Sequence, residues 1–107
     1  MRRQRMLPKA RKGEILASAI RLARQPGGWN SITRAAVSHE AKCSEGIVSF
    51  YFGSMQGLRK EVMKTAIKFE FFDVIGQGIA SGDRYALATS ARIKAQAIKL
   101  FFAASED

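Results

Sequence analysis

Few side chains in this sequence could carry out covalent chemistry. The chain holds one histidine, His39, and one cysteine, Cys43. This pair cannot form an internal disulfide or the ligand set of a zinc site, and His39 has no plausible nucleophile beside it. The neighbouring acids Glu70 and Asp73 fall in a segment rich in aromatic residues. We therefore expect no enzyme activity, no metal and no cofactor, and we expect a reducing, cytoplasmic setting.

A short glycine motif, residues 76–78, resembles part of a dinucleotide-binding loop. No strand is predicted before it, and Ser81 stands where a third glycine belongs. We interpret the motif as a break between helices, continued by Ser81 and Gly82.

The residues best suited to noncovalent recognition lie between Thr33 and Leu58. Two short helical patterns flank a tight connection there, and Thr33 and Ser44 are good N-cap residues for the two helices. Hydroxyls, a carboxylate and aromatic rings follow Ser44 up to Phe52. The pattern predicts a helix-turn-helix whose recognition helix begins at Ser44.

Charge favours a polyanionic partner for this segment. The formal net charge is +9, and residues 1–60 contain twelve Lys or Arg against three acids, whereas residues 61–107 contain six of each. A field so one-sided attracts nucleic acid and makes binding depend strongly on salt. We therefore expect the motif to bind nucleic acid.

The remaining pattern predicts an all-α fold. We expect a first helix over residues 9–25, a stop at residues 26–28, a fourth helix from Ser54 to about Ile75, and a last helix from Asp83 to about Ala104. The fourth helix has apolar residues on two opposite faces, which predicts two neighbours. The expected organisation is a basic flexible arm (1–10), a three-helix helix-turn-helix DNA-binding head (11–53), and two longer helices forming a linker and dimerisation region (54–107).

Residues 11–68 resemble the TetR (tetracycline-repressor) family of bacterial transcriptional regulators. Residues 41–44 read AKCS where the family usually has AGVS, and residues 53–58 read GSMQGL, close to the family's GSKEGL. The spacing from Thr33 to Leu58 matches without a gap. Three departures bear on DNA contacts: Lys42 replaces the usual turn glycine, Ser49 stands where tyrosine is common, and Met55 replaces a frequent lysine.

The resemblance implies a role for each position of the motif. Thr33 and the amides at its helix start would lie against a phosphate, as would Lys42. Glu45 and Ser49 would face base edges, and Gly46 would let the backbone approach the major groove. Aromatic and aliphatic side chains would contact sugar-phosphate or a thymine methyl group. The full set expected to contact DNA is Thr33, Arg34, Lys42, Ser44, Glu45, Gly46, Ile47, Ser49, Phe50 and Tyr51, with Arg3 and Arg5 of the arm.

Other interpretations remain open for several of these residues. Glu45 can serve as a favourable acid in a first helical turn. Phe50 and Tyr51 are also credible core aromatics, although neighbours in a helix cannot both point inward. The arm can be a solvating tail rather than a minor-groove contact. Val48, Phe52 and Cys43 are expected in the core.

The resemblance also bears on assembly. Family members usually have a larger second domain that binds an inducer and dimerises, and only about forty residues follow the resembling segment here. We expect a homodimeric repressor of a palindromic operator in double-stranded DNA, with no small-molecule inducer. The expected dimer interface is Met63, Ile67, Phe71, Val74, Leu87, Ala91, Ile98, Phe101 and Phe102.

The alternative is a non-enzymatic interaction module. In that reading the apolar last helix docks onto another protein, and the basic surface binds nucleic acid without sequence preference. No segment approaches the roughly twenty apolar residues needed to span a bilayer, so we expect no membrane role.

Overall fold

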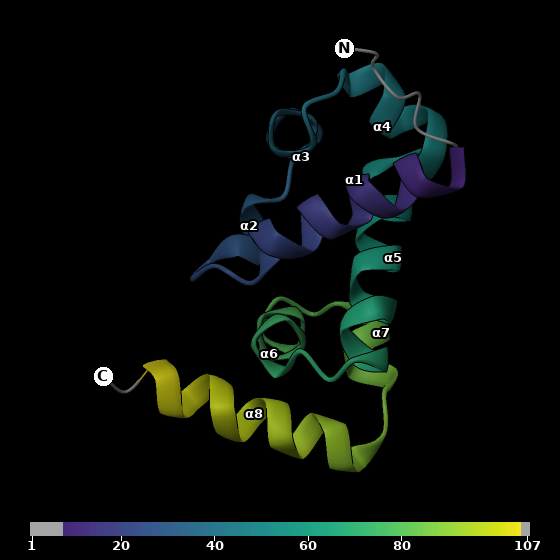
Figure 1. Cartoon of the computed structure of the whole chain (residues 1–107). Helices are drawn as coiled ribbons and strands as arrows, with labels where there is room; N and C mark the ends of the chain where they lie inside the picture. The colour runs from purple at the N-terminus through teal and green to yellow at the C-terminus, as the bar shows by residue number, and fades with distance from the viewer. Residues whose placement is uncertain (1–7, 106–107) are drawn as a thin grey trace.

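The computed structural model describes residues 8–105, and this part of the chain is entirely helical. Figure 1 shows α3 and α4 at one end of the molecule and α8 at the other, with α5 running between them. The long dimension is 49 Å, against 27 and 22 Å across. The helices are α1 (Pro8–Ala23), α2 (Gly28–Ser31), α3 (Arg34–Ala41), α4 (Glu45–Phe52), α5 (Met55–Lys68), α6 (Phe72–Ala80), α7 (Arg84–Ala88) and α8 (Ala91–Ser105).

Helix α1 begins earlier than expected. It starts at Pro8, and proline is favoured at a first helical position because its fixed φ suits the helix and its missing N–H would be unpaired there. Residues 8–10 of the expected arm are therefore helical, and residues 1–7 lie outside the described residues. Helix α1 ends at Ala23, two residues before the expected end, and within the expected stop Gly27 adopts a left-handed φ of 70° before α2 begins at Gly28.

A single hydrophobic core joins the two ends of the molecule. Ile15 of α1, Val37 of α3 and Val48 of α4 belong to the same buried cluster as residues from every later helix. Burial of such side chains contributes about 1.5–3 kcal/mol each to folding. The fully or nearly fully buried apolar set is Ile15, Ala19, Ala23, Trp29, Ile32, Val37, Val48, Leu58, Val62, Met63, Ala66, Val74, Ile75, Ala86 and Ala97.

The expected long helix from Ser54 to Ile75 is wrong. Helix α5 ends at Lys68, Glu70 takes a left-handed φ of 57°, and α6 begins at Phe72. This turn folds α6 back against α5, so that Met63 and Val74 are both fully buried. The chain itself therefore covers the second apolar face of α5 at Met63, and leaves Ile67 half-buried.

The glycines at 76 and 78 lie inside α6 and do not break it, contrary to our expectation. A Cβ at Gly76 would come within 2.6 Å of the Phe101 Cβ, and one at Gly78 would overlap the Met63 methyl group. Both glycines thus allow close approach of neighbouring helices. Helix α6 ends at Ala80, with Ser81 as its C-cap, before Gly82 with its φ of 80°.

The expected last helix is also divided. Asp83 caps α7 as predicted, because its Oδ2 accepts hydrogen bonds from the Tyr85 and Ala86 amides at 3.1 and 2.9 Å. Helix α7 ends at Ala88, and the Ser90 hydroxyl accepts from the Ile93 amide at 3.3 Å at the start of α8. The described residues after Ser54 therefore form four helices instead of two.

Two side chains from this region fix the chain around α2. The Gln77 Oε1 accepts from the Trp29 amide at 2.9 Å, and its Nε2 donates to the Ala23 carbonyl at 2.9 Å. Arg59 donates to the Trp29 and Ile32 carbonyls at 2.7 and 2.9 Å. Gln77 is buried, and it satisfies one backbone group at the end of α1 and another in α2.

Charged side chains also lie where α1 and α2 meet α5 and α6. Burial lowers the pKa of the Arg59 guanidinium from its ordinary value, and the Asp83 carboxylate opposes that shift. Arg24 at the end of α1 pairs with Asp73 of α6, with 2.9 Å between Nε and Oδ2. Arg24 and Asp73 are both partly exposed, so their ion pair contributes at most about 1 kcal/mol to the free energy of unfolding.

Replacing Gln77 by leucine tests this junction. Gln77→Leu keeps the side-chain volume but leaves the Trp29 amide and the Ala23 carbonyl without this partner, which we expect to cost about 2–4 kcal/mol of unfolding free energy. Urea unfolding measures the change. The exposed Gln96 of α8 gives the matched control, since Gln96→Leu should stay within about 0.5 kcal/mol of the parent. Equal stability of the two variants would contradict the role of Gln77.

Candidate nucleic-acid interface

Helices α3 and α4 begin at the two predicted caps. The Thr33 Oγ1 accepts from the Ala36 amide at 3.0 Å, and the Ser44 Oγ accepts from the Ile47 amide at 3.2 Å. Both cap residues have extended backbones, as N-cap residues do. The first turn of each helix keeps further free N–H groups that can bind an anion.

The connection between these helices turns at Lys42. Its φ and ψ are 59° and 47°, in the left-handed region, and the Cys43 amide donates to the Ser38 carbonyl at 2.9 Å. A side chain in this region costs about 1–2 kcal/mol, which explains why glycine suits the position. Lys42 is exposed, so its ammonium group is free to reach solvent or a ligand.

Helix α4 has an inner side that packs on the core and an outer side that faces solvent. Val48 is buried, while Ile47, Tyr51 and Phe52 are partly buried against the core. Cys43 and Phe52, which we expected in the core, therefore lie at its edge. The outer side exposes Glu45, Gly46 and Phe50, and Ser49 is half-buried.

The structure distinguishes the two adjacent aromatic residues of α4. Phe50 is 78 % exposed, whereas Tyr51 packs against the core, and the two rings meet edge to face with centroids 5.0 Å apart. The core interpretation is therefore wrong for Phe50 and right in part for Tyr51. Phe50 presents an oriented aromatic ring to the outside.

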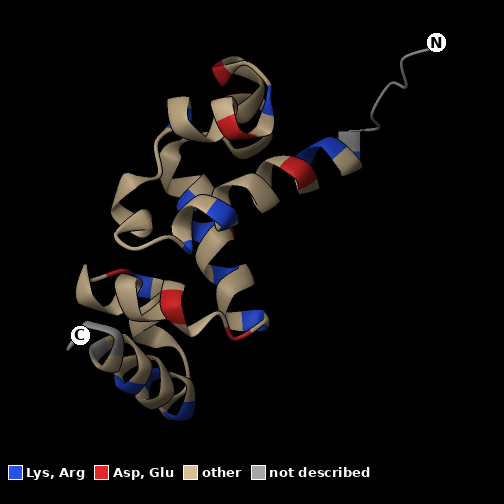
Figure 2. Ribbon diagram, turned by 60° about the vertical axis from the view of Figure 1, so that its left-hand side comes forward, with Lys and Arg blue, Asp and Glu red and all other residues tan. Residues whose placement is uncertain are grey.

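Basic residues border α4 from other elements. The Lys12 Nζ of α1 lies 5.4 Å from the centroid of the Phe52 ring, and Lys42 precedes α4 in the chain. Arg21 pairs with Glu40 at 3.1 Å, which offsets one acid of α3. Figure 2 shows basic residues spread over α1, α5 and α8 rather than gathered on α4. Arg3 and Arg5 lie outside the described residues.

Lys12 is a border residue that sequence reasoning did not single out. It lies 40 positions before Phe52, and no local periodicity connects the two residues. Only the packing of α1 beside α4 brings them together. Arg34 is half-buried at the start of α3.

Some of the residues expected at the dimer interface are accessible to a partner chain, and others are not. Met63 and Val74 are fully buried within one chain, so the expectation that they contact a partner is wrong. Leu87, Ala91 and Ile98 are exposed, whereas Ile67, Phe71 and Phe101 are half-buried. The side chain of Phe102 lies outside the described residues. Leu100, which is not in the expected dimer set, is 47 % exposed.

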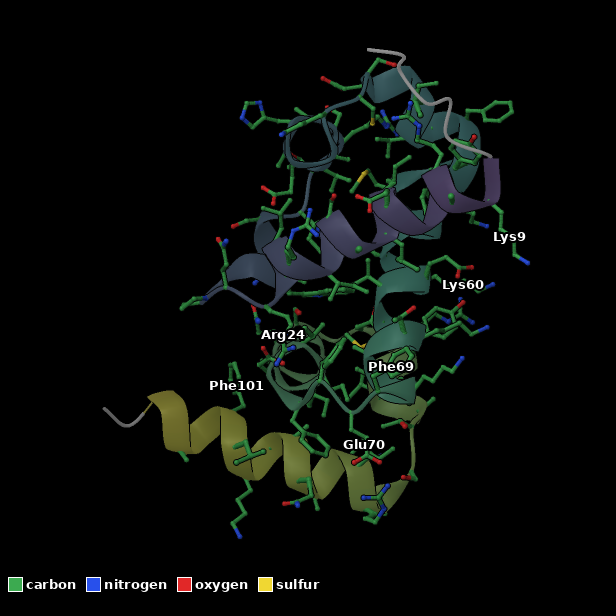
Figure 3. The ribbon with its side chains drawn as sticks, in the orientation of Figure 1. Lys9, Arg24, Lys60, Phe69, Glu70 and Phe101 are labelled. Atoms are coloured by element: carbon green, nitrogen blue, oxygen red, sulfur yellow. The ribbon has the colours of Figure 1, made fainter. Side chains whose placement is uncertain are left out.

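A cleft of about 600 Å³ lies where the α1–α2 loop meets α6 and α8. Its lining includes Pro26, Phe72 and Phe101, together with three charged residues that each form an ion pair: Arg24 with Asp73, and Glu70 with Arg92 outside it. Figure 3 shows Arg24 and Phe101 on the two sides of this junction. The Asp73 Oδ2 is taken by Arg24, whereas the Asp73 Oδ1 is buried without a hydrogen-bond partner among the described residues.

Within residues 8–105, no group of three or more His, Cys, Asp or Glu residues is placed to hold a metal ion. The same residues contain no helix of sufficient length and apolarity to cross a membrane.

Comparison with protein-family models, with curated proteins and with solved structures gave no match.

The left-handed backbone at Lys42 gives a stability prediction. Lys42→Gly should raise the unfolding free energy by about 1 kcal/mol, because glycine adopts this φ without a steric penalty. Lys42→Ala removes the same charge but keeps a Cβ, so it should leave stability close to the parent value. Urea unfolding of the three proteins checks this, and a destabilised glycine variant would contradict the left-handed turn.

Proposed function

We propose that this protein is a sequence-specific DNA-binding transcriptional regulator, a repressor that binds a palindromic operator as a homodimer. The observation that carries the proposal is the pair of capped helices, α3 and α4, joined by a tight turn, with the outer side of α4 left exposed. A helix of this kind can enter the major groove while the preceding helix crosses the backbone.

Electrostatics supports DNA as the partner. Lys42 and Lys12 border α4, and the amides at the start of α3 can bind a phosphate beside Arg34. Phosphate contacts of this kind position a protein, whereas side chains on the outer side of α4 specify sequence. The excess positive charge of residues 1–60 adds attraction over a longer range.

The exposed apolar residues of α8 support the homodimer. Ile98 is 39 % exposed, and Ala91 and Ala95 lie on the same flank of the helix at its 100° spacing. Small residues around an apolar side chain permit close approach of a second helix. A two-fold dimer through this flank would present two α4 helices to half-sites about one DNA turn apart.

Salt dependence of DNA binding tests the phosphate contacts. The operator is first selected from a random duplex pool with the full chain, and affinity is then measured by fluorescence anisotropy over a salt series. Lys42→Ala and Arg34→Ala should each weaken binding at all sequences and lower the slope of log K against log salt by about 1.

The control for this experiment is Lys99→Ala, which removes a positive charge from exposed α8 at the other end of the molecule. Its slope should equal that of the parent. Selection that enriches no sequence, with binding that ignores sequence at every salt, would refute the regulator and favour the interaction module.

Ile98→Asp tests the dimer. A carboxylate at this flank would be buried without a partner in the assembled dimer, so the variant should sediment as a monomer in analytical ultracentrifugation and lose operator affinity. Gln96→Asp introduces the same charge about 200° around α8, and this control should remain a dimer. A parent protein that is monomeric at micromolar concentration would contradict the proposed assembly.

A further inference from the structure

The exposed side of α4 lacks the side chains that usually read purines. Its sequence, EGIVSFYF, contains no Arg, Lys, Asn or Gln. Bidentate hydrogen bonds to guanine come from Arg or Lys, and those to adenine come from Asn or Gln. A DNA site read by this helix therefore cannot be specified through those contacts.

The group that α4 does present is an aromatic ring. Phe50 is 78 % exposed and is held edge to face against Tyr51, which itself packs on the core. In the major groove the only apolar group on a base edge is the C5 methyl of thymine. An exposed and oriented phenyl ring is complementary to that methyl group.

Gly46 supplies the clearance that such a contact needs. It lies one turn before Phe50 on the same side of α4, and a Cβ added there would meet only the Ser44 Oγ at 3.8 Å. The fold itself therefore does not require glycine at this position, although glycine lowers helix stability relative to alanine. Its absence of a side chain leaves room for another surface beside the ring.

We propose that α4 specifies its operator through thymine methyl groups, with Phe50 as the specificity-determining residue. Glu45, also exposed on α4, supplements this readout by accepting a hydrogen bond from cytosine N4. This inference rests on the proposed function, because it assigns the base class that the proposed DNA-binding helix recognises.

Deoxyuridine substitution tests the inference, because it removes only the C5 methyl group of a thymine. In the selected operator, the thymines of one half-site are replaced one at a time, and anisotropy titrations give the affinity of the full chain for each duplex. At the contacted thymine we expect about fourfold weaker binding by the parent, the value for one buried methyl-sized group.

Phe50→Ala should weaken binding to the thymine operator and abolish the fourfold difference between thymine and deoxyuridine at that position. Phe69→Ala is the matched control, because Phe69 is 59 % exposed and lies at the end of α5 away from α4 (Figure 3). This control should keep the fourfold difference. Thermal unfolding verifies that both variants are folded.

Two outcomes would overturn the inference while leaving a sequence-specific regulator intact: no deoxyuridine changes the affinity of the parent, or Phe50→Ala retains the full difference. Selection that enriches no operator would overturn the proposed function itself and this inference with it.

Discussion

The arrangement of the two ends of the molecule depends on the hydrogen bonds of the Gln77 side-chain amide. This amide accepts from Trp29 and donates to Ala23, so it satisfies backbone groups at both ends of the α1–α2 connection. These groups lie in a buried environment, where an unpaired N–H or C=O is costly. Arg59 binds the same connection from α5 through two carbonyls. The direction of α1, and with it the support of α3 and α4, is thereby tied to α5 and α6.

The helices after Ser54 also complete the core that holds α4 in place. Gly76 and Gly78 let Phe101 and Met63 pack directly on the α6 backbone, so α8 and α5 approach α6 closely. Val48 then anchors the inner side of α4 in the same continuous core. Because that side is occupied by packing, Glu45, Gly46 and Phe50 remain on the outside. The proposed DNA-binding surface is thus a consequence of the packing beneath it.

Local signals in the sequence were sufficient where the structure depends on neighbouring residues. The caps at Thr33, Ser44 and Asp83 follow from hydroxyl or carboxylate oxygens that reach amides two or three positions ahead. The left-handed turn at Lys42 agrees with the glycine that the resembled family has there. Local signals gave wrong helix boundaries where distant contacts override local preference. Gly76 and Gly78, which would usually interrupt a helix, lie inside α6, and the chain reverses direction at Glu70. The apolar second face of α5 gave no indication whether α6 or another chain would cover it.

By itself, the sequence determined the all-helical class of the described residues, the positions of the principal caps, and the concentration of positive charge in the first half of the chain. It could do so because helix periodicity, capping and charge are properties of short segments. The tertiary structure alone decided that Met63 and Val74 are internal, that Lys12 borders α4, and that Phe50 points outward while Tyr51 packs inward. The physical reason is that burial depends on which distant helices share a core.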